Sequence, residues 1–340
     1  MKLSQAMTAV EATIKHNLEL GENASNASYL IPMLWSLPGE GKSTGIEDKV
    51  KELGMELITV MFGQFDAGEL GGFPIVNHTT KEYERARPFF MPTSGTGVIF
   101  LDELPQAPVA NQNIAAQLVN ERRIGEHKLP AGWSVVCAGN PMSARAGTNA
   151  MPAHLKDRLT HLDIETDHKG FREYALGKGF LPEITGFINE RPEWLQKFDP
   201  KQNASPSPRS WERVNSIMKL GLEPAVENQM IKGQIGEAPL ADFSGFLQIW
   251  RDLPVSEEVI QQCETHAIPS DPAILYALCS SLAHKATKGN IKNIITFIKR
   301  FISKEFAAFL MRDALARDPE LKKEKSVQEW FLTEGKELLL

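Results

Sequence analysis

The chain lacks several residue patterns that mark particular protein classes. It has 3 cysteines in 340 residues, and Cys137, Cys263 and Cys279 lie far apart in the sequence. This number and spacing exclude a disulfide framework and a cysteine-based zinc motif, and they favour reduced thiols in a cytoplasmic protein. No apolar run approaches the ~18 residues that a membrane span needs.

The first residues also lack the unbroken apolar core of a signal peptide. Apolar side chains instead recur at helical spacing in this segment, at Leu3, Met7, Val10, Ile14 and Leu18. The spacing predicts an amphipathic helix within residues 1–24. The formal net charge is −6, which argues against general affinity for nucleic acid but leaves a local basic stripe open.

Short apolar runs alternate with helical patterns in the first half of the chain. The runs cover residues 29–35, 56–62, 97–102, 133–139 and 160–165. Runs of this length, separated by helices, predict a mostly parallel α/β sheet that is covered on both faces. From about residue 168 the strand signals stop. We therefore expect an α/β core over residues 25–167, a helical lid over residues 168–242 and a helical region over residues 243–340.

The first apolar run leads into LPGEGKST, which resembles a phosphate-binding loop. Two glycines let backbone N–H groups curve around a phosphate at the N-terminus of the next helix. Lys42 would reach the β- and γ-phosphates of a nucleotide, and the Ser43 hydroxyl would bind Mg²⁺. The predicted nucleotide-binding residues are Pro38, Gly39, Glu40, Gly41, Lys42, Ser43 and Thr44.

The loop departs from the full signature at one position. Ser36 stands where the signature has a glycine, five residues before the Gly-Lys pair. Serine is the smallest side chain that can replace glycine, so it strains the loop least. An ordinary turn between a strand and a helix is the alternative interpretation.

A second motif ends the apolar run at residues 97–102. Asp102 and Glu103 are adjacent acids at this point. A strand of an open α/β sheet delivers such residues to the edge where ligands bind. Asp102 would hold Mg²⁺ through water, and Glu103 would orient and deprotonate the attacking water. The alternative is that both acids only cap the helix that starts near Pro105.

Taken together, residues 25–220 resemble an AAA+ ATPase of the MoxR/RavA-like, dynein-related branch, in particular a phage-encoded or prophage-encoded member of it. The resemblance implies that Asn140, after the run at 133–139, is the sensor-1 residue. It also implies that Arg158 is the arginine finger for a neighbouring subunit. In the segment SPSPRSWERV, Arg209 resembles the sensor-2 arginine, and the pattern predicts Ser207 as the helix N-cap.

Two further segments carry the resemblance. Residues 62–76 resemble the helix-2 insert of this branch, and residues 121–133 resemble the hairpin before sensor 1. Leu159 departs from the pattern, because relatives more often have phenylalanine there. Arg145 is the alternative candidate for the finger.

The resemblance implies a five-stranded parallel P-loop sheet of order 5-1-4-3-2, followed by the helical lid. It implies Mg²⁺-dependent ATP hydrolysis in a homo-oligomeric ring, a hexamer, coupled to remodelling or chaperoning of a protein client. It further implies a partner with a von Willebrand A domain. Two other functions stay open at this point: a nucleic-acid-associated AAA+ motor, and a nucleotide-gated scaffold with little turnover.

Residues 290–311 have apolar side chains at helical spacing together with several basic ones. The apolar positions are Ile291, Ile294, Ile295, Ile298, Ile302, Phe306 and Phe309. We expect one amphipathic helix that packs into a core and exposes a basic face. A helix that binds a membrane or a partner is the alternative.

Overall fold

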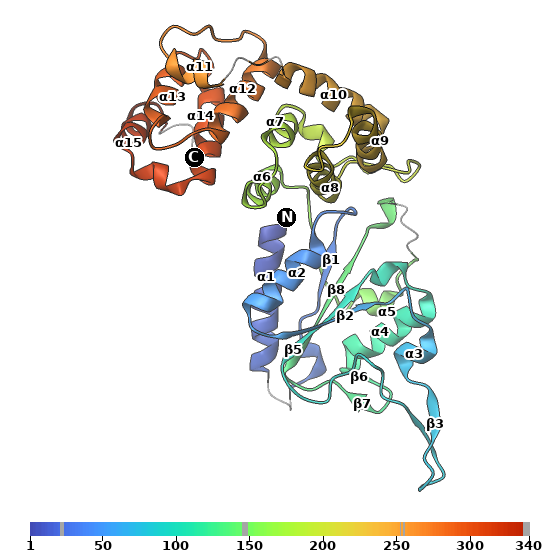
Figure 1. Cartoon of the computed structure of the whole chain (residues 1–340). Helices are drawn as coiled ribbons and strands as arrows, with labels where there is room; N and C mark the ends of the chain where they lie inside the picture. Colours follow the sequence, from blue (N-terminus) through green and yellow to red (C-terminus); the bar gives the residue numbers. More distant parts are fainter. Residues whose placement is uncertain (21–23, 145–148, 252, 254–255, 336–340) are drawn as a thin grey trace. The chain divides into compact units, whose positions relative to one another are not determined.

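The computed structural model describes residues 1–20, 24–144, 149–251, 253 and 256–335 (Figure 1). The chain forms two compact units. The first comprises Met1–Asp167 and Phe198–Pro200, and the second comprises His168–Lys197 and Lys201–Leu340. Among the described residues, none of the helices combines the length and the apolar character that crossing a membrane requires.

A five-stranded sheet with all neighbours parallel forms the centre of the first unit. Its strands are β1 (Pro32–Trp35), β2 (Glu56–Met61), β5 (Gly97–Asp102), β8 (Trp133–Gly139) and β9 (Thr160–Asp163). They are ordered β2-β5-β8-β1-β9, and every pair is parallel. Counted among these five strands alone and from the β9 edge, the order is 5-1-4-3-2, which confirms the prediction.

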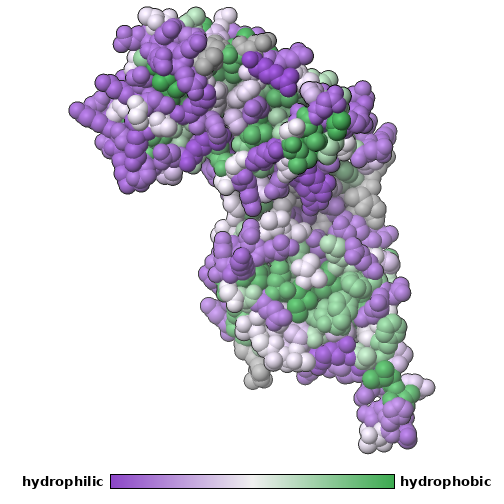
Figure 2. Space-filling model, viewed as in Figure 1, coloured by the Kyte–Doolittle hydropathy of each residue, from purple (hydrophilic) through white to green (hydrophobic). Residues whose placement is uncertain are grey.

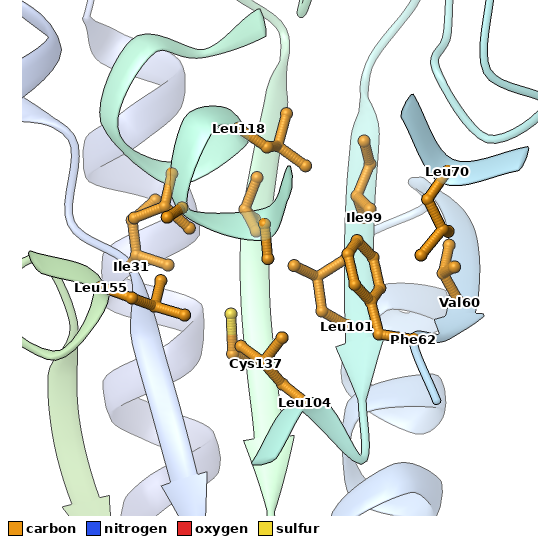
Figure 3. Close-up of a cluster of buried hydrophobic side chains, with 14 of the residues drawn as sticks. Ile31, Val60, Phe62, Leu70, Ile99, Leu101, Leu104, Leu118, Cys137 and Leu155 are labelled. Carbon is orange, nitrogen blue, oxygen red and sulfur yellow. The ribbon is translucent and has the colours of Figure 1, made fainter. Parts of the chain in front are cut away.

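Helices cover both faces of this sheet, because strand side chains alternate between two apolar clusters. On one face lie α1 (Leu3–Glu19) and α2 (Lys42–Glu52), whose Ile14 and Ile46 side chains join the same cluster as Val136 of β8. On the other face, α3 (Ala67–Gly71), α4 (Val109–Glu121) and α5 (Ala153–Lys156) pack on the alternate residues. Figure 3 shows part of this second cluster, with Leu70, Leu118 and Leu155 facing Ile99, Leu101 and Cys137.

Two antiparallel hairpins extend from the first unit. Strands β3 (Pro74–Val76) and β4 (Tyr83–Arg85) form one, and β6 (Arg123–Ile124) and β7 (His127–Lys128) form the other. The second lies in the segment where the sequence predicts a hairpin. The first follows α3 and projects from the rest of the unit (Figures 1 and 2). All of its strand residues are exposed.

The described part of the second unit is helical and has two apolar cores. The first core joins Phe171, Trp211 and Phe243, and the second joins Leu278, Phe297 and Trp330. The helices of the unit are α6 (His168–Gly177), α7 (Pro182–Glu190), α8 (Pro208–Met218), α9 (Pro224–Ile235), α10 (Glu237–Arg251), α11 (Ser256–Gln261), α12 (Pro272–His284), α13 (Ile291–Ile298), α14 (Lys304–Arg317) and α15 (Lys325–Trp330).

Short helical turns connect these elements. They are 3₁₀ turns at Asn26–Ser28, Leu104–Gln106, Met142–Ala144, Pro192–Trp194 and Pro319–Lys323, and a π turn at Phe331–Gly335.

The finer division of the chain, with boundaries after residues 24 and 242, stays a prediction.

The prediction of a single helix over residues 290–311 is wrong. The chain leaves helical geometry after Ile298 and begins α14 at Lys304. The turn between them buries Phe301 in the core and leaves Ile302 fully exposed. The expected packing into a core is confirmed for Ile291, Ile294, Ile295 and Ile298 of α13, all of which are buried.

The three cysteines differ in their surroundings. Cys137 in β8 and Cys279 in α12 are completely buried, and burial raises the pKa of both thiols well above the usual range. Cys263 is half-buried. No disulfide links them.

Candidate functional site

The loop after β1 has the backbone of a phosphate cradle. Gly39 and Gly41 have φ angles of 86° and 84°, in the left-handed region that favours glycine. Gly41 is the N-cap of α2, and a Cβ atom at this position would lie 3.4 Å from the Leu3 side chain of α1. The loop therefore needs its two glycines, and it leads into an 11-residue helix whose first-turn N–H groups cannot be paired within the helix itself.

Ser36 fits the loop without backbone strain. Its φ lies outside the left-handed region. The described non-glycine residues inside that region are Lys81, Glu103 and Arg122. Its amide donates to the Gly139 carbonyl at 3.4 Å, which extends the pairing of β1 with β8 by one residue. A serine in place of the signature glycine therefore leaves the course of the loop intact.

The Lys42 side chain lies between the ends of β1 and β8. Its ammonium donates to the Ser36 carbonyl at 3.1 Å, to the Ser36 hydroxyl at 2.8 Å and to Asn140 Oδ1 at 3.1 Å. Lys42 is 9% exposed, although it carries a positive charge. The predicted phosphate-binding lysine and the predicted sensor residue are therefore in direct contact.

The loop and the acidic strand meet through Ser43 and Asp102. The Ser43 hydroxyl donates to Asp102 Oδ2 at 2.7 Å, and Asp102 is buried at the end of β5. A hydroxyl and a carboxylate provide hard oxygen ligands, which Mg²⁺ prefers together with phosphate oxygens and water. These two side chains fit the magnesium position that the sequence predicts for them. The described residues include no group of three or more His, Cys, Asp or Glu side chains that could hold a metal ion, so a Mg²⁺ bound here would take its other ligands from phosphate and water.

Glu103 occupies a special backbone position directly after β5. It has φ 54° and ψ 30°, in the left-handed region, and its amide donates to Asp102 Oδ1 at 2.9 Å. Non-glycine residues in this region cost conformational energy and are frequent at functional sites. The Glu103 residue is exposed, so water can reach its carboxylate.

Glu40 connects the loop to the end of the sheet. The Thr166 hydroxyl donates a short hydrogen bond to Glu40 Oε1, and Thr166 follows β9, just before the second unit begins. Burial raises the pKa of the Glu40 carboxyl group, while the hydrogen bond from Thr166 and the charge of Lys42 lower it. Sequence reasoning placed Glu40 in the loop but missed Thr166, because 126 residues separate the two and no pattern links them.

The remaining predicted residues lie in other parts of the loop, in other elements or outside the described residues. Thr44 is exposed on the first turn of α2, and Pro38 is half-buried in the loop. Arg209 is exposed on the first turn of α8 in the second unit, where the Ser207 side chain accepts from the Ser210 amide and confirms the predicted N-cap. Arg145 lies outside the described residues.

Arg158 lies at the opposite end of the sheet from the loop. It precedes β9, whose Thr160 pairs with Pro32 at the amino end of β1, whereas the loop follows the carboxyl end of β1. Arg158 is exposed and lines a pocket of about 250 Å³ together with Asn26, Asn120 and Thr160. The sheet therefore separates this arginine from the Lys42 cluster of its own chain.

Comparisons with known proteins give distant structural similarity only. The sequence matches no protein-family model and no curated protein. NtrX from Brucella abortus is 14% identical with a TM-score of 0.41, covering 92% of this chain and 67% of that chain. A RuvB mutant from Thermotoga maritima is 14% identical with a TM-score of 0.38, covering 82% of this chain and 80% of that chain. PCH-2 from C. elegans is 12% identical with a TM-score of 0.35, covering 72% of this chain and 69% of that chain.

The fold class follows from the chain's own topology. The first unit is an α/β core with a phosphate-loop backbone after its first strand and a parallel sheet of order 5-1-4-3-2. The glycine loop follows β1, Asp102 is the last residue of β5, and Glu103 comes directly after it. Both motifs therefore lie at the carboxyl edge of the sheet, where open α/β sheets bind ligands.

Proposed function

We propose that the chain is a Mg²⁺-dependent ATPase of the AAA+ class. The observation that carries this proposal is the convergence of Lys42, Ser43, Asp102 and Asn140 at one edge of the sheet. These side chains supply an ammonium, a hydroxyl–carboxylate pair and an amide. They lie beside the N-terminus of α2, and a helix N-terminus favours negative charge. This set matches the needs of phosphoryl transfer, in which positioning and charge stabilisation do most of the work.

Each side chain has a separate role in this proposal. Lys42 binds the β- and γ-phosphates, and the loop amides hold the rest of the phosphate chain. Ser43 and Asp102 hold Mg²⁺, which neutralises charge on the phosphates when bound. Glu103, exposed at the end of β5, takes the proton of the attacking water, and Asn140 orients that water.

The proposal extends to a ring of identical subunits, a hexamer of the MoxR-like type. Arg158 lies at the far end of the sheet from its own loop, so it is suited to act on a neighbouring subunit. Arg209 would sense the nucleotide from the helical lid. The work of the ring would be the remodelling of a protein client, with a von Willebrand A domain protein as partner.

Two substitutions test the ATPase proposal. Lys42→Ala should abolish ATP binding measured by calorimetry, because the phosphates lose their cationic partner. Glu103→Gln should bind ATP normally and hydrolyse at least ~100-fold more slowly, because the general base is lost. Equal affinity of the wild type and Lys42→Ala would contradict the site. A wild type that binds ATP with Mg²⁺ but shows no turnover would instead favour a nucleotide-gated scaffold.

The Glu103→Gln variant should also retain the client during affinity purification.

A further inference from the structure

Ser36 gives this loop a group that the signature glycine lacks. Its hydroxyl oxygen lies 2.8 Å from the Lys42 ammonium nitrogen, in a place where Ser36 is 3% exposed and Lys42 9% exposed. The same hydroxyl donates to the Leu37 carbonyl at 3.0 Å. With its proton directed at Leu37, the oxygen presents its lone pairs to the ammonium.

We propose that Ser36 is a positioning residue that tethers the Lys42 ammonium at the end of β1 and thereby weakens the binding of nucleoside triphosphate. The inference rests on the proposed ATPase function, because it concerns the lysine that would bind the phosphates. It assigns the departure from the loop signature a role in setting nucleotide affinity.

The tether follows from the donors and acceptors around Lys42. An ammonium group has three N–H donors, and the Ser36 carbonyl, the Ser36 hydroxyl and Asn140 Oδ1 can accept all three. A phosphate oxygen that reaches Lys42 must therefore replace at least one of these acceptors. With glycine at position 36, the hydroxyl would be absent, and a phosphate oxygen would compete with one acceptor fewer for the ammonium.

The expected size of the effect follows from the worth of one hydrogen bond. A net gain typical of a hydrogen bond within a protein corresponds to about a three- to tenfold change in an equilibrium constant. The charge of Lys42 and the burial of both groups place this bond toward the upper end of that range.

Nucleotide affinity is the first measurement. ATP binding at fixed Mg²⁺ is compared by calorimetry for the wild type, Ser36→Ala and Ser134→Ala. Ser134 is a matched control, because it is a buried serine of β8 whose hydroxyl has no hydrogen-bond partner among the described residues. Ser36→Ala should bind ATP about three- to tenfold more tightly, and Ser134→Ala should match the wild type. Unchanged or weaker binding by Ser36→Ala would overturn the inference.

A double-mutant cycle without nucleotide tests the tether itself. The unfolding constants of the wild type, Ser36→Ala, Lys42→Met and the double variant are measured by chemical denaturation. Ser36→Ala should raise the unfolding constant about three- to tenfold in the wild-type background, and clearly less when Lys42→Met is present. Additive effects would show that no tether exists. A wild type that fails to bind ATP would reject the proposed function, whereas this cycle would still decide on the tether.

Discussion

The Ser43 hydroxyl and the Asp102 carboxylate are joined by a hydrogen bond of 2.7 Å, although 59 residues separate them in the chain. Ser43 lies on the first turn of α2, the helix after β1, and Asp102 ends β5, the neighbour of β8 in the sheet. The bond holds both oxygen atoms, which are the proposed ligands for Mg²⁺, at one point on the carboxyl edge of the sheet. Their spacing is consequently set by the fold and does not depend on a flexible loop.

Asp102→Asn should raise the Mg²⁺ concentration required for half-maximal ATP turnover by about tenfold or more. The substitution removes a negative charge next to the proposed metal, and outer ligands of this type typically contribute 10- to 100-fold to metal affinity. The measurement is ATPase rate against Mg²⁺ concentration. Asp48→Asn, at an exposed position of α2, is the control and should leave the curve unchanged. Identical curves for Asp102→Asn and the wild type would remove Asp102 from the metal site.

Arg158→Ala should bind ATP almost normally and lose about 10³-fold in turnover, as expected when an arginine finger is lost. The physical reason is that Arg158 lies at the opposite end of the sheet from its own loop, so in the proposed ring it would act on a neighbouring subunit. Activity per subunit of the wild type should then also rise with protein concentration, because isolated subunits of such a ring would have incomplete sites.

Mixing two inactive variants distinguishes action in trans from action in cis. Arg158→Ala keeps Glu103, and Glu103→Gln keeps Arg158, so mixed rings should recover part of the activity. Arg213→Ala, at an exposed arginine of α8, is the control and should retain full turnover. Failure of the mixture to recover activity, with a rate per subunit that is independent of concentration, would exclude Arg158 and make Arg145 the next candidate.

The elements predicted best from the sequence are those whose local pattern determines their environment. Every residue of β5 and β8 is buried, so their continuous apolar runs identify central strands directly. The Ser207–Pro208 pair likewise marks the start of α8 by local capping chemistry. Because parallel strands end at the same edge, the meeting of the loop with the acidic pair could also be predicted.

Other features depend on contacts between distant segments and leave no local pattern. The bond between Thr166 and Glu40 is one example, and the exposure of Ile302 is another, because helical spacing continues through the turn that exposes it. The hydroxyl of Ser36 was visible in the sequence, but its bond to Lys42 depends on the curvature of the loop.

Asp313 of α14 offers a test of stability against pH. Its side chain is 0% exposed, Arg317 Nε lies 3.6 Å from Oδ2, and neither carboxylate oxygen has a hydrogen-bond partner among the described residues. Burial raises the pKa of this carboxyl group more than the charges of Arg317 and Arg172 lower it. Folding therefore favours the protonated form, and stability is lost as pH rises above the unfolded-state pKa of about 4.

Asp313→Asn should be more stable than the wild type at pH 7 by about 1–2 kcal/mol, because the neutral amide avoids burying a charge. The difference should grow as pH rises from about 4 and become constant once the carboxyl group ionises in the folded state. Denaturation of the full chain at several pH values measures it. Glu329→Gln, which neutralises an exposed acid, should give a small difference at all pH values. A wild type that is more stable than Asp313→Asn at pH 7 would contradict the prediction.

DNA should change the ATPase rate by less than about twofold at physiological salt. The net charge of −6 opposes contact with phosphate backbones. The measurement adds duplex or single-stranded DNA to the ATPase assay over a range of salt concentrations. Strong stimulation of the ATPase rate by DNA that falls steeply with added salt would favour a nucleic-acid motor instead, because DNA binding that releases counterions weakens as salt rises.

The burial of two cysteines makes the native chain a substrate for single-site labelling. Maleimide reagents attack the thiolate, which Cys137 and Cys279 rarely form because burial raises their pKa, whereas Cys263 is half-buried and can react. A fluorophore could therefore be attached at one position of the second unit without mutagenesis. The appearance of a second and a third labelled thiol would then report, residue by residue, the opening of α12 and of the central sheet.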